Sequence, residues 1–320
     1  MKSLPIFWLS TICVVVVAYG LSEQLFGEQI GSTKPTTAEA SKVSAPQKTA
    51  ATAAKERVAE AQLKEAPEAR ALWEQARQRL RSYQSIKARL VETVALGQRR
   101  FTVSGDYQQG HGAELKLRLE FKVRVGNTDG SILEVCDGQV LWTRHQIGTE
   151  TRISRRDVRQ ILQAAAESGM SEDLLIVELG FGGLPGLFAS IEKSMLFVKQ
   201  SEETYEGHKL VVIEGGWKPE MLKAWQGNNP NSPLPDYVPS RVRLYFDSNT
   251  LFPRRILYLG RTPEQSLRPM VSLDFTEVQT NIPLAADLFK FKQPEGVFPE
   301  DLTDQFLEQI KRRQLGGPAS

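Results

Sequence analysis

The chain has little of the side-chain chemistry that disulfide-rich, metal-binding and hydrolytic proteins depend on. It contains two cysteines, Cys13 and Cys136, among 320 residues. They are not expected to pair, because Cys13 lies in an apolar N-terminal run and Cys136 lies in a segment with strand character. The three histidines stand apart, at His111, His145 and His208. With no cysteine or histidine spacing typical of a metal site, we expect no disulfide framework, no metal and no other cofactor.

Catalytic motifs are missing from the sequence as well. Neither a serine nucleophile elbow nor an HExxH helix is present. The segment GFGGLPG has Pro185 where a phosphate-binding G-x-G-x-x-G loop needs its third glycine, and no βαβ pattern surrounds it. Acidic pairs such as Glu202-Glu203 are interpreted as solvated turns. The sequence therefore predicts a noncatalytic protein, and an enzyme with widely dispersed site residues is the more distant alternative.

The balance of charge excludes a strong electrostatic partner. The chain contains 40 Lys and Arg residues and 38 Asp and Glu residues, which gives a formal net charge of +2. No nucleic-acid partner is expected from such a balance. Basic pairs such as Arg155-Arg156 are interleaved with acidic residues, which favours a solvated surface over contact with a membrane surface. With 41% hydrophobic residues, the chain can bury a sizeable core.

The first 26 residues predict a signal peptide or an N-terminal membrane anchor. No charge occurs from Leu4 to Leu21, and Ala18 and Gly20 offer the small residues of a cleavage site. About 18 apolar residues lie between the length of a long signal peptide and that of a short membrane span, so both alternatives stay open. The chain is thus expected in the cell envelope. Within the envelope it is expected to be periplasmic, either secreted after cleavage or anchored to the inner membrane by residues 4–21.

Residues 27–65 predict a flexible linker. This stretch is rich in Ala, Thr, Lys and Pro and has too few large apolar groups to offset the entropy of ordering. A folded domain is therefore expected over residues 66–315.

The domain is expected to open with a helix from about Glu68. Apolar residues recur there at helical spacing, and Trp73 is expected to fall off that stripe. The stripe consists of Leu72, Ala76, Leu80 and Tyr83.

A strictly alternating segment, AELKLRLEFKVRV, follows this helix. Charged residues occupy one face, which predicts an antiparallel sheet with one wet side and one buried side. A tight hairpin is expected at Asp137-Gly138. The apolar face comprises Leu115, Leu117, Leu119, Phe121, Val123 and Val125.

The rest of the chain continues as helices and then strands. Helices are expected over residues 154–168 and 171–179, and the loop 227–239 is too rich in Asn and Pro for regular structure. Strand signals return in MLFVKQ, HKLVVIEG, SRVRLYFD, FPRRILYLG and RPMVSLDFTEVQT. The order of helix, strands, helices and strands indicates an α+β fold.

Four segments, in order, resemble the LolA-like family of periplasmic lipoprotein carriers and related envelope proteins. They are YQSIKARLVE, RFTVSGDYQQ, SILEVCDGQVLW and LAADLFKFKQPEGV, and the resemblance covers about residues 70–300. It implies an unclosed antiparallel β half-barrel with helices covering the concave face. It also implies that Phe289 and Phe291 share one face of a closing strand. The strand LKLRLEFKV lacks the proline of the family's Arg-Pro dipeptide, so no lid role is assigned to Arg118.

The resemblance implies an apolar concavity that binds a lipid or an acylated protein. The alternative is that the same side chains fill the concavity as an ordinary core, which leaves a protein-interaction or sensor module of the same fold. The glycines of GFGGLPG permit either a mobile lid or close helix packing. The sequence does not indicate the oligomeric state. The candidate cavity residues are Leu115, Leu117, Leu119, Phe121, Trp142, Leu187 and Phe188.

Overall fold

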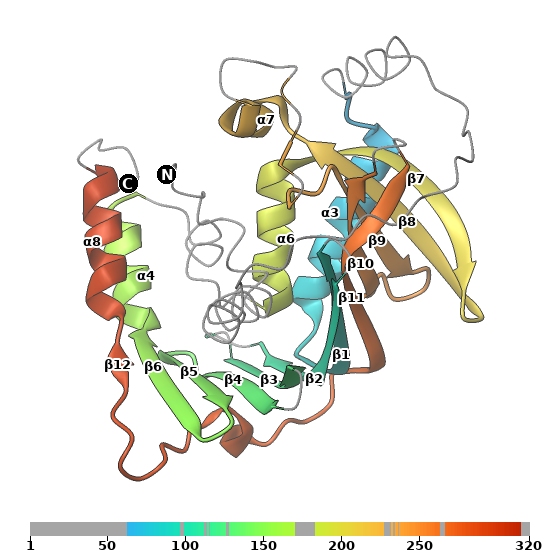
Figure 1. Ribbon diagram of the computed structural model, residues 1–320. Coiled ribbons are helices and arrows are strands. Elements are labelled where there is room, and N and C mark those ends of the chain that lie inside the picture. The colour runs from blue at the N-terminus through green and yellow to red at the C-terminus, as the bar shows by residue number, and fades with distance from the viewer. Residues whose placement is uncertain are drawn as a thin grey trace, which may run out of the picture.

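The fold is built on one large sheet that does not close into a barrel (Figure 1). The sheet has 12 strands in the order β12-β6-β5-β4-β3-β2-β1-β11-β10-β9-β8-β7. This computed structural model describes residues 63–96, 99–111, 114, 116–125, 128–169, 183–226, 232, 234–235, 237–262 and 266–314. The expected α+β half-barrel, antiparallel and unclosed with helices on its concave face, is confirmed in these residues.

Two wings of antiparallel strands meet at the pair β1 and β11. The first wing is a meander of β1 (Ser85–Leu96), β2 (Arg99–Gly110), β3 (Lys116–Val125), β4 (Thr128–Cys136), β5 (Val140–Ile147) and β6 (Glu150–Asp157). The second contains β7 (Met195–Tyr205), β8 (His208–Trp217), β9 (Arg241–Asp247), β10 (Pro253–Arg261) and β11 (Leu267–Thr280). The short β12 (Glu300–Asp301) pairs with β6 in parallel.

The predicted hairpin joins β4 to β5. The Asp137 carboxylate accepts hydrogen bonds from the N–H groups of Gln139 and Val140, each at 2.9 Å. Gly138 has a φ of 101°, a left-handed conformation that favours glycine. Local turn chemistry therefore sets the register in which β4 and β5 pair.

The helices form two groups, one beside the β7 wing and one at the β6 end of the sheet (Figure 1). The helices α3 (Pro67–Ser82) and α6 (Gly183–Ser194) pack against β7, while α4 (Val158–Glu167) and α8 (Thr303–Gln314) pack on each other near β5 and β6. A further helix, α7 (Pro219–Gln226), precedes the Asn/Pro-rich loop.

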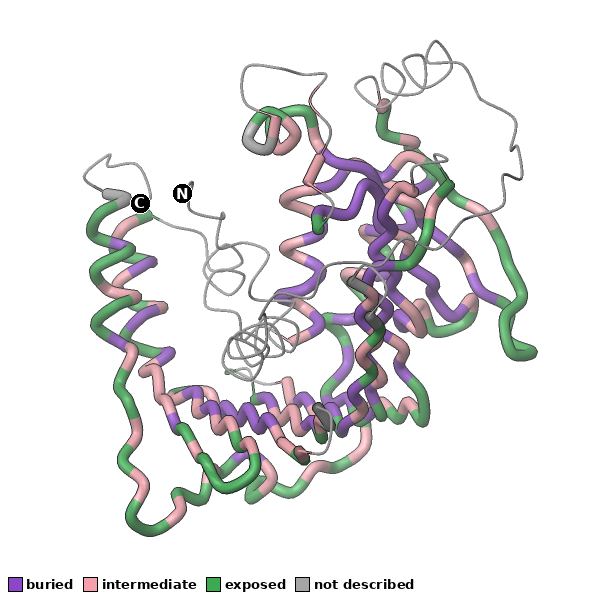
Figure 2. The backbone as a smooth tube through the Cα atoms, viewed as in Figure 1, coloured by how far each residue is buried: buried purple, intermediate pink, exposed green. Residues whose placement is uncertain are grey.

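An aromatic cluster fills the space beneath α3 and α6. The Trp73 ring lies 4.7 Å from the Phe188 ring and 4.5 Å from the Phe197 ring, measured between centroids. Trp73 is fully buried, so the expectation that it falls off the apolar stripe is wrong. It is one turn from Ala69 and next to Leu72, and together they widen the buried face of α3. Figure 2 shows this buried zone continuing into the neighbouring strands.

The helix predicted over residues 154–168 begins later than expected. Residues 154–157 complete β6, and α4 starts at Val158, where the Asp157 carboxylate accepts a 2.8 Å hydrogen bond from the Gln160 N–H. Pairing with β5 continues to Asp157 and holds this charged run extended. The helix predicted over residues 171–179 lies outside the described residues.

Residues 281–299, here named the strap, are not the closing strand that the resemblance implied. They contain a short 3-10 turn, η2 (Ala286–Phe289), followed by irregular chain that leads to β12. The strap starts at Asn281, whose N–H donates to the Ser85 carbonyl at 2.9 Å. It crosses the outer face of the first wing (Figure 1), where the Phe291 ring stacks on Trp142. Because β11 lies mid-sheet, the chain must cross β1–β5 to reach the free edge of β6.

Candidate functional site

The apolar stripe of β3 faces the inside of the half-barrel, as the alternation predicted. Leu117, Leu119 and Phe121 share one face, and residues paired directly across an antiparallel ladder share it too. Their partners on β2 are Gln109, Tyr107 and Gly105, and their partners on β4 are Cys136, Glu134 and Ile132.

Burial divides this stripe into two kinds of residue. Leu117 and Phe121 are 2% and 1% exposed and belong to the core. Leu119 and Val123 pack against the same core but remain half-buried. The concave face of β3 therefore keeps apolar side chains partly open, and these provide the kind of surface that an apolar ligand can cover.

The N-terminal end of α6 closes one side of this surface. Tyr107 Oη accepts a 2.9 Å hydrogen bond from the Leu184 N–H, and Gly183 adopts a φ of 53°. A Cβ on Gly183 would lie 2.6 Å from Tyr107 Oη and 3.3 Å from Leu117 Cδ1. Glycine is therefore needed for close packing here, which agrees with the second interpretation of GFGGLPG at this position. Residues 180–182 of that motif lie outside the described residues.

Two further candidate cavity residues lie on α6. Leu187 and Phe188 are buried, and Phe188 belongs to the aromatic cluster under α3, where side chains already fill the space. Leu115 lies outside the described residues.

The grouping of Trp142 with the β3 stripe is wrong. Trp142 pairs with Val135 and Arg155, whereas its neighbour Leu141 pairs with Cys136. Trp142 therefore points to the outer face, where it stacks on Phe291 with centroids 4.9 Å apart and an interplanar angle of 6°. The strap covers the indole, which explains why a large aromatic side chain lies on the outside of the sheet.

Titratable groups that are buried (Glu92 and Glu134) or half-buried (His145) lie on the concave face, and sequence reasoning missed them. Burial raises the pKa of the Glu92 carboxyl to about 8, and its Oε1 atom has no hydrogen-bond partner in the described part of the chain. Burial also raises the pKa of Glu134, although Arg156 opposes the shift. Burial lowers the pKa of His145, and Arg156 and Arg152 lower it further. The surroundings thus favour the neutral form of each of the three groups.

A polar chain inside the concave face was also missed. The Tyr107 hydroxyl donates to Gln109 Oε1, and Gln109 Nε2 lies at hydrogen-bond distance from His111 Nε2. The sequence signal was the period-2 spacing of these three residues in YQQGH, which places the first two on the face of Leu117.

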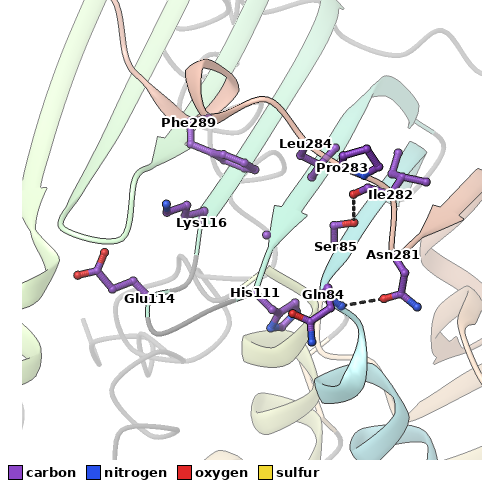
Figure 3. Close-up of a pocket in the computed structure, with 12 residues that line it drawn as sticks. Gln84, Ser85, His111, Glu114, Lys116, Asn281, Ile282, Pro283, Leu284 and Phe289 are labelled. Atoms are coloured by element: carbon purple, nitrogen blue, oxygen red, sulfur yellow. Dashed lines mark hydrogen bonds between the residues drawn. The ribbon is translucent and has the colours of Figure 1, made fainter.

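A pocket of about 630 Å³ opens between the strap and the adjoining ends of β2 and β3 (Figure 3). The apolar side chains of its wall come from the strap, and the polar ones come from Asn281 at the start of the strap and from the chain around β1, β2 and β3. The lining side chains include Gln84, Ser85, His111, Glu114, Lys116, Asn281, Ile282, Pro283, Leu284 and Phe289.

Within the described ranges, no group of three or more His, Cys, Asp or Glu residues could hold a metal ion. None of the helices described here has both the length and the hydropathy required to cross a membrane.

Comparisons with known proteins give only a distant structural likeness. No protein-family model matches the chain, and no curated protein matches it significantly. The Mycobacterium tuberculosis lipoprotein LppX aligns with 12% identity and a TM-score of 0.38, over 69% of this chain and 99% of LppX. A LolA superfamily protein from Nitrosomonas europaea aligns with 12% identity and a TM-score of 0.25, over 70% of this chain and 97% of that one.

MucB, in its complex with MucA from Pseudomonas aeruginosa, aligns with 13% identity and a TM-score of 0.35. That match covers 70% of this chain and 61% of the other. All three matches are structural likenesses at low identity, with TM-scores below 0.4. The likeness is distant, and the ligands and partners of those proteins do not transfer to this chain through it.

Proposed function

We propose that this protein is a noncatalytic cell-envelope protein that binds the acyl chain of a lipid or of a lipidated polypeptide, in lipoprotein sorting or transport. The binding surface is the concave face of β2–β4. The observation that carries the proposal is the half-buried state of Leu119 and Val123, which extend the buried core to a partly open apolar surface.

Acyl-chain binding needs no catalytic or metal chemistry. Each buried methylene contributes about 0.8 kcal/mol, so ten of them contribute about 8 kcal/mol before the cost of ordering the ligand. Glu134 pairs directly across the ladder from Leu119 and is held towards its neutral form, which lowers the cost of covering it with an apolar chain.

A second candidate function is a periplasmic protein-interaction or sensor module whose concavity is filled by its own side chains. The packing of Trp73 between Phe188 and Phe197 favours it, because that part of the concave side has an ordinary core. The two candidates differ in whether the surface at Leu119 takes up a ligand.

The proposed location in the envelope comes from the N-terminal sequence. Residues 4–21 would target the chain for export or anchor it to the inner membrane, and residues 27–65 would connect that segment to the folded domain. Residues 4–21 and 27–62 lie outside the described residues.

Uptake of a fluorescent fatty acid by residues 60–320, purified without detergent, tests the proposal. Leu119→Glu places a charge on the proposed surface and is expected to weaken binding at least tenfold, because a carboxylate under an acyl chain is costly to desolvate. The matched control is Leu267→Glu, since Leu267 is also half-buried but packs against the separate cluster of Leu210, Val212, Tyr245, Leu257 and Leu259.

Saturable binding that Leu119→Glu abolishes and Leu267→Glu retains would support the lipid-binding function. Native mass spectrometry of the same fragment would then identify any lipid that copurifies. No uptake by the wild-type fragment, or equal loss in both variants, would refute the acyl-chain proposal and favour the protein-interaction module.

A further inference from the structure

A continuous chain of hydrogen bonds connects His111 with the first turn of α6. The Leu184 N–H donates to Tyr107 Oη at 2.9 Å, and the Tyr107 hydroxyl donates to Gln109 Oε1. Gln109 Nε2 then meets His111 Nε2. Tyr107 and Gln109 are 3% and 0% exposed, so their polar groups have no access to bulk water as alternative partners.

Chemistry fixes the direction of every bond in this chain when His111 is neutral. An amide nitrogen can only donate, so His111 Nε2 must be the unprotonated ring nitrogen that accepts from Gln109. The Gln109 carbonyl oxygen then accepts from the Tyr107 hydroxyl. The hydroxyl oxygen remains available to accept from the Leu184 N–H, and each group has a partner.

A proton on His111 reverses this order. Imidazolium donates from both nitrogens, so Gln109 must rotate its amide to present Oε1 to His111 Nε2. The amide NH2 then points at the Tyr107 oxygen, and the Tyr107 hydroxyl hydrogen loses its acceptor in a buried place. An unsatisfied buried donor is unfavourable, and the Gln109 NH2 now competes with the Leu184 N–H for the Tyr107 oxygen.

The pocket under the strap connects His111 with solvent. His111 lines this pocket, and its backbone N–H donates to the Gln84 carbonyl at 2.9 Å, which fixes the backbone beside the pocket (Figure 3). The other titratable side chains of the lining are Glu114 and Lys116, both exposed and of opposite charge. A proton can therefore reach the imidazole from water, although Tyr107 and Gln109 are buried.

We propose that His111 is a proton-sensing residue that controls how firmly the N-terminal end of α6 is held on β2. At neutral pH the chain of hydrogen bonds holds Leu184 against Tyr107. Acidification protonates His111, turns the Gln109 amide and releases the first turn of α6. The device does not require the concave face to bind a lipid.

The sign of the pH dependence follows from linkage. Burial lowers the pKa of His111 below its ordinary value of 6.5, so the unfolded or undocked state takes up the proton first. The stabilising contribution is complete above pH 6.5 and is lost as the pH falls towards the lowered pKa of the docked state.

Amide hydrogen exchange at Leu184 measures the docking directly. Full-length protein labelled with nitrogen-15 at leucine and histidine is compared at pH 7.5 and pH 5, with each rate corrected for intrinsic exchange chemistry. Protection of the Leu184 amide is expected to fall about tenfold at the lower pH, the effect of losing one hydrogen bond.

Three variants assign the cause. His111→Gln removes the titrating group and should leave Leu184 protection independent of pH. Tyr107→Phe removes the acceptor and should leave protection low at both pH values. His145→Gln is the matched control, because His145 is also a half-buried histidine on the sheet but lies outside the chain, and it should keep the wild-type fall.

A second measurement, of chemical shifts in the wild-type protein, keeps the proposal testable if a variant fails to fold. The Leu184 amide shift and the His111 Nε2 shift should titrate with one midpoint. Separate midpoints, constant protection from pH 7.5 to 5, or a fall that persists in His111→Gln would overturn the proposal.

Discussion

Replacing Glu92 with glutamine should change how stability depends on pH. Glu92 lies on β1 with its side chain on the concave face, paired across the sheet with Val103 and Leu273. It is 2% exposed, and burial raises its pKa from an ordinary 4.5 to about 8. At neutral pH the group is thus a neutral carboxylic acid inside an apolar core, and glutamine is its closest neutral replacement.

The magnitude follows from the two pKa values. Because the folded state holds the proton more tightly, the contribution of Glu92 is complete below pH 4.5 and is lost as the pH rises through the folded pKa of about 8. Each pH unit in that window costs about 1.4 kcal/mol, so the full loss approaches about 5 kcal/mol. Glu92→Gln does not titrate and should escape this loss.

Urea unfolding from pH 5 to pH 8, followed by circular dichroism, measures the difference. Wild-type and variant should have similar free energies of unfolding near pH 5, and the variant should become the more stable as the pH rises. Glu203→Gln, the same chemical change at an exposed position of β7, is the matched control. Parallel profiles for wild-type and Glu92→Gln would refute the idea that this carboxyl is protonated in the folded protein.

Three further substitutions test the packing. Gly183→Ala should cost about 1–3 kcal/mol in urea unfolding, and more than Gly207→Ala, which has a similar positive φ but open space around it. Phe291→Ala should lower the thermal midpoint by removing the stack on Trp142, which contributes about 0.5–1.5 kcal/mol beyond the burial of area. An unchanged midpoint would mean that polar contacts alone hold the strap. Burial alone would raise the pKa of Asp247, but its hydrogen bonds in the β9–β10 turn lower the pKa below 3.8. Asp247→Ala should therefore lower the free energy of unfolding by about 1–3 kcal/mol at pH 7. The difference from wild-type should shrink in acid, where the wild-type carboxylate is protonated.

The sequence predicted the elements whose signals are local. Strict alternation placed the apolar face of β3 correctly, and Asp137-Gly138 placed the hairpin, because side-chain direction and turn geometry are set within a few residues. Residues 154–157 were misassigned because a charged run has no period that separates a helix from an edge strand. Only its pairing with β5 decides.

Contacts distant in the sequence account for the other errors. Apolar residues lie on both faces of the strand around Trp142, so the local pattern does not indicate which face the indole occupies. Its contact with Phe291 of the strap, which is distant in the sequence, decides this. Tyr107 and Gln109 are polar, and no local pattern marks them as buried. They are buried because α6 brings an N–H group that needs an acceptor, and that helix is far away in the sequence.

The polar groups of the concave face together define a pH window. Glu92 charges as the pH rises towards about 8, and His111, whose pKa burial lowers from the ordinary 6.5, charges only at acidic pH below that value. Each charge destabilises the packing of the face on which Leu119 lies. The Glu92 carboxylate does so from within the core, and protonated His111 does so by loosening α6. If that face binds an acyl chain, uptake should therefore be greatest between these limits and decline on both sides. Glu92→Gln should remove the alkaline decline alone and His111→Gln the acidic decline alone, because the two groups act through separate contacts. A single variant that removed both declines would mean that one group governs the whole face.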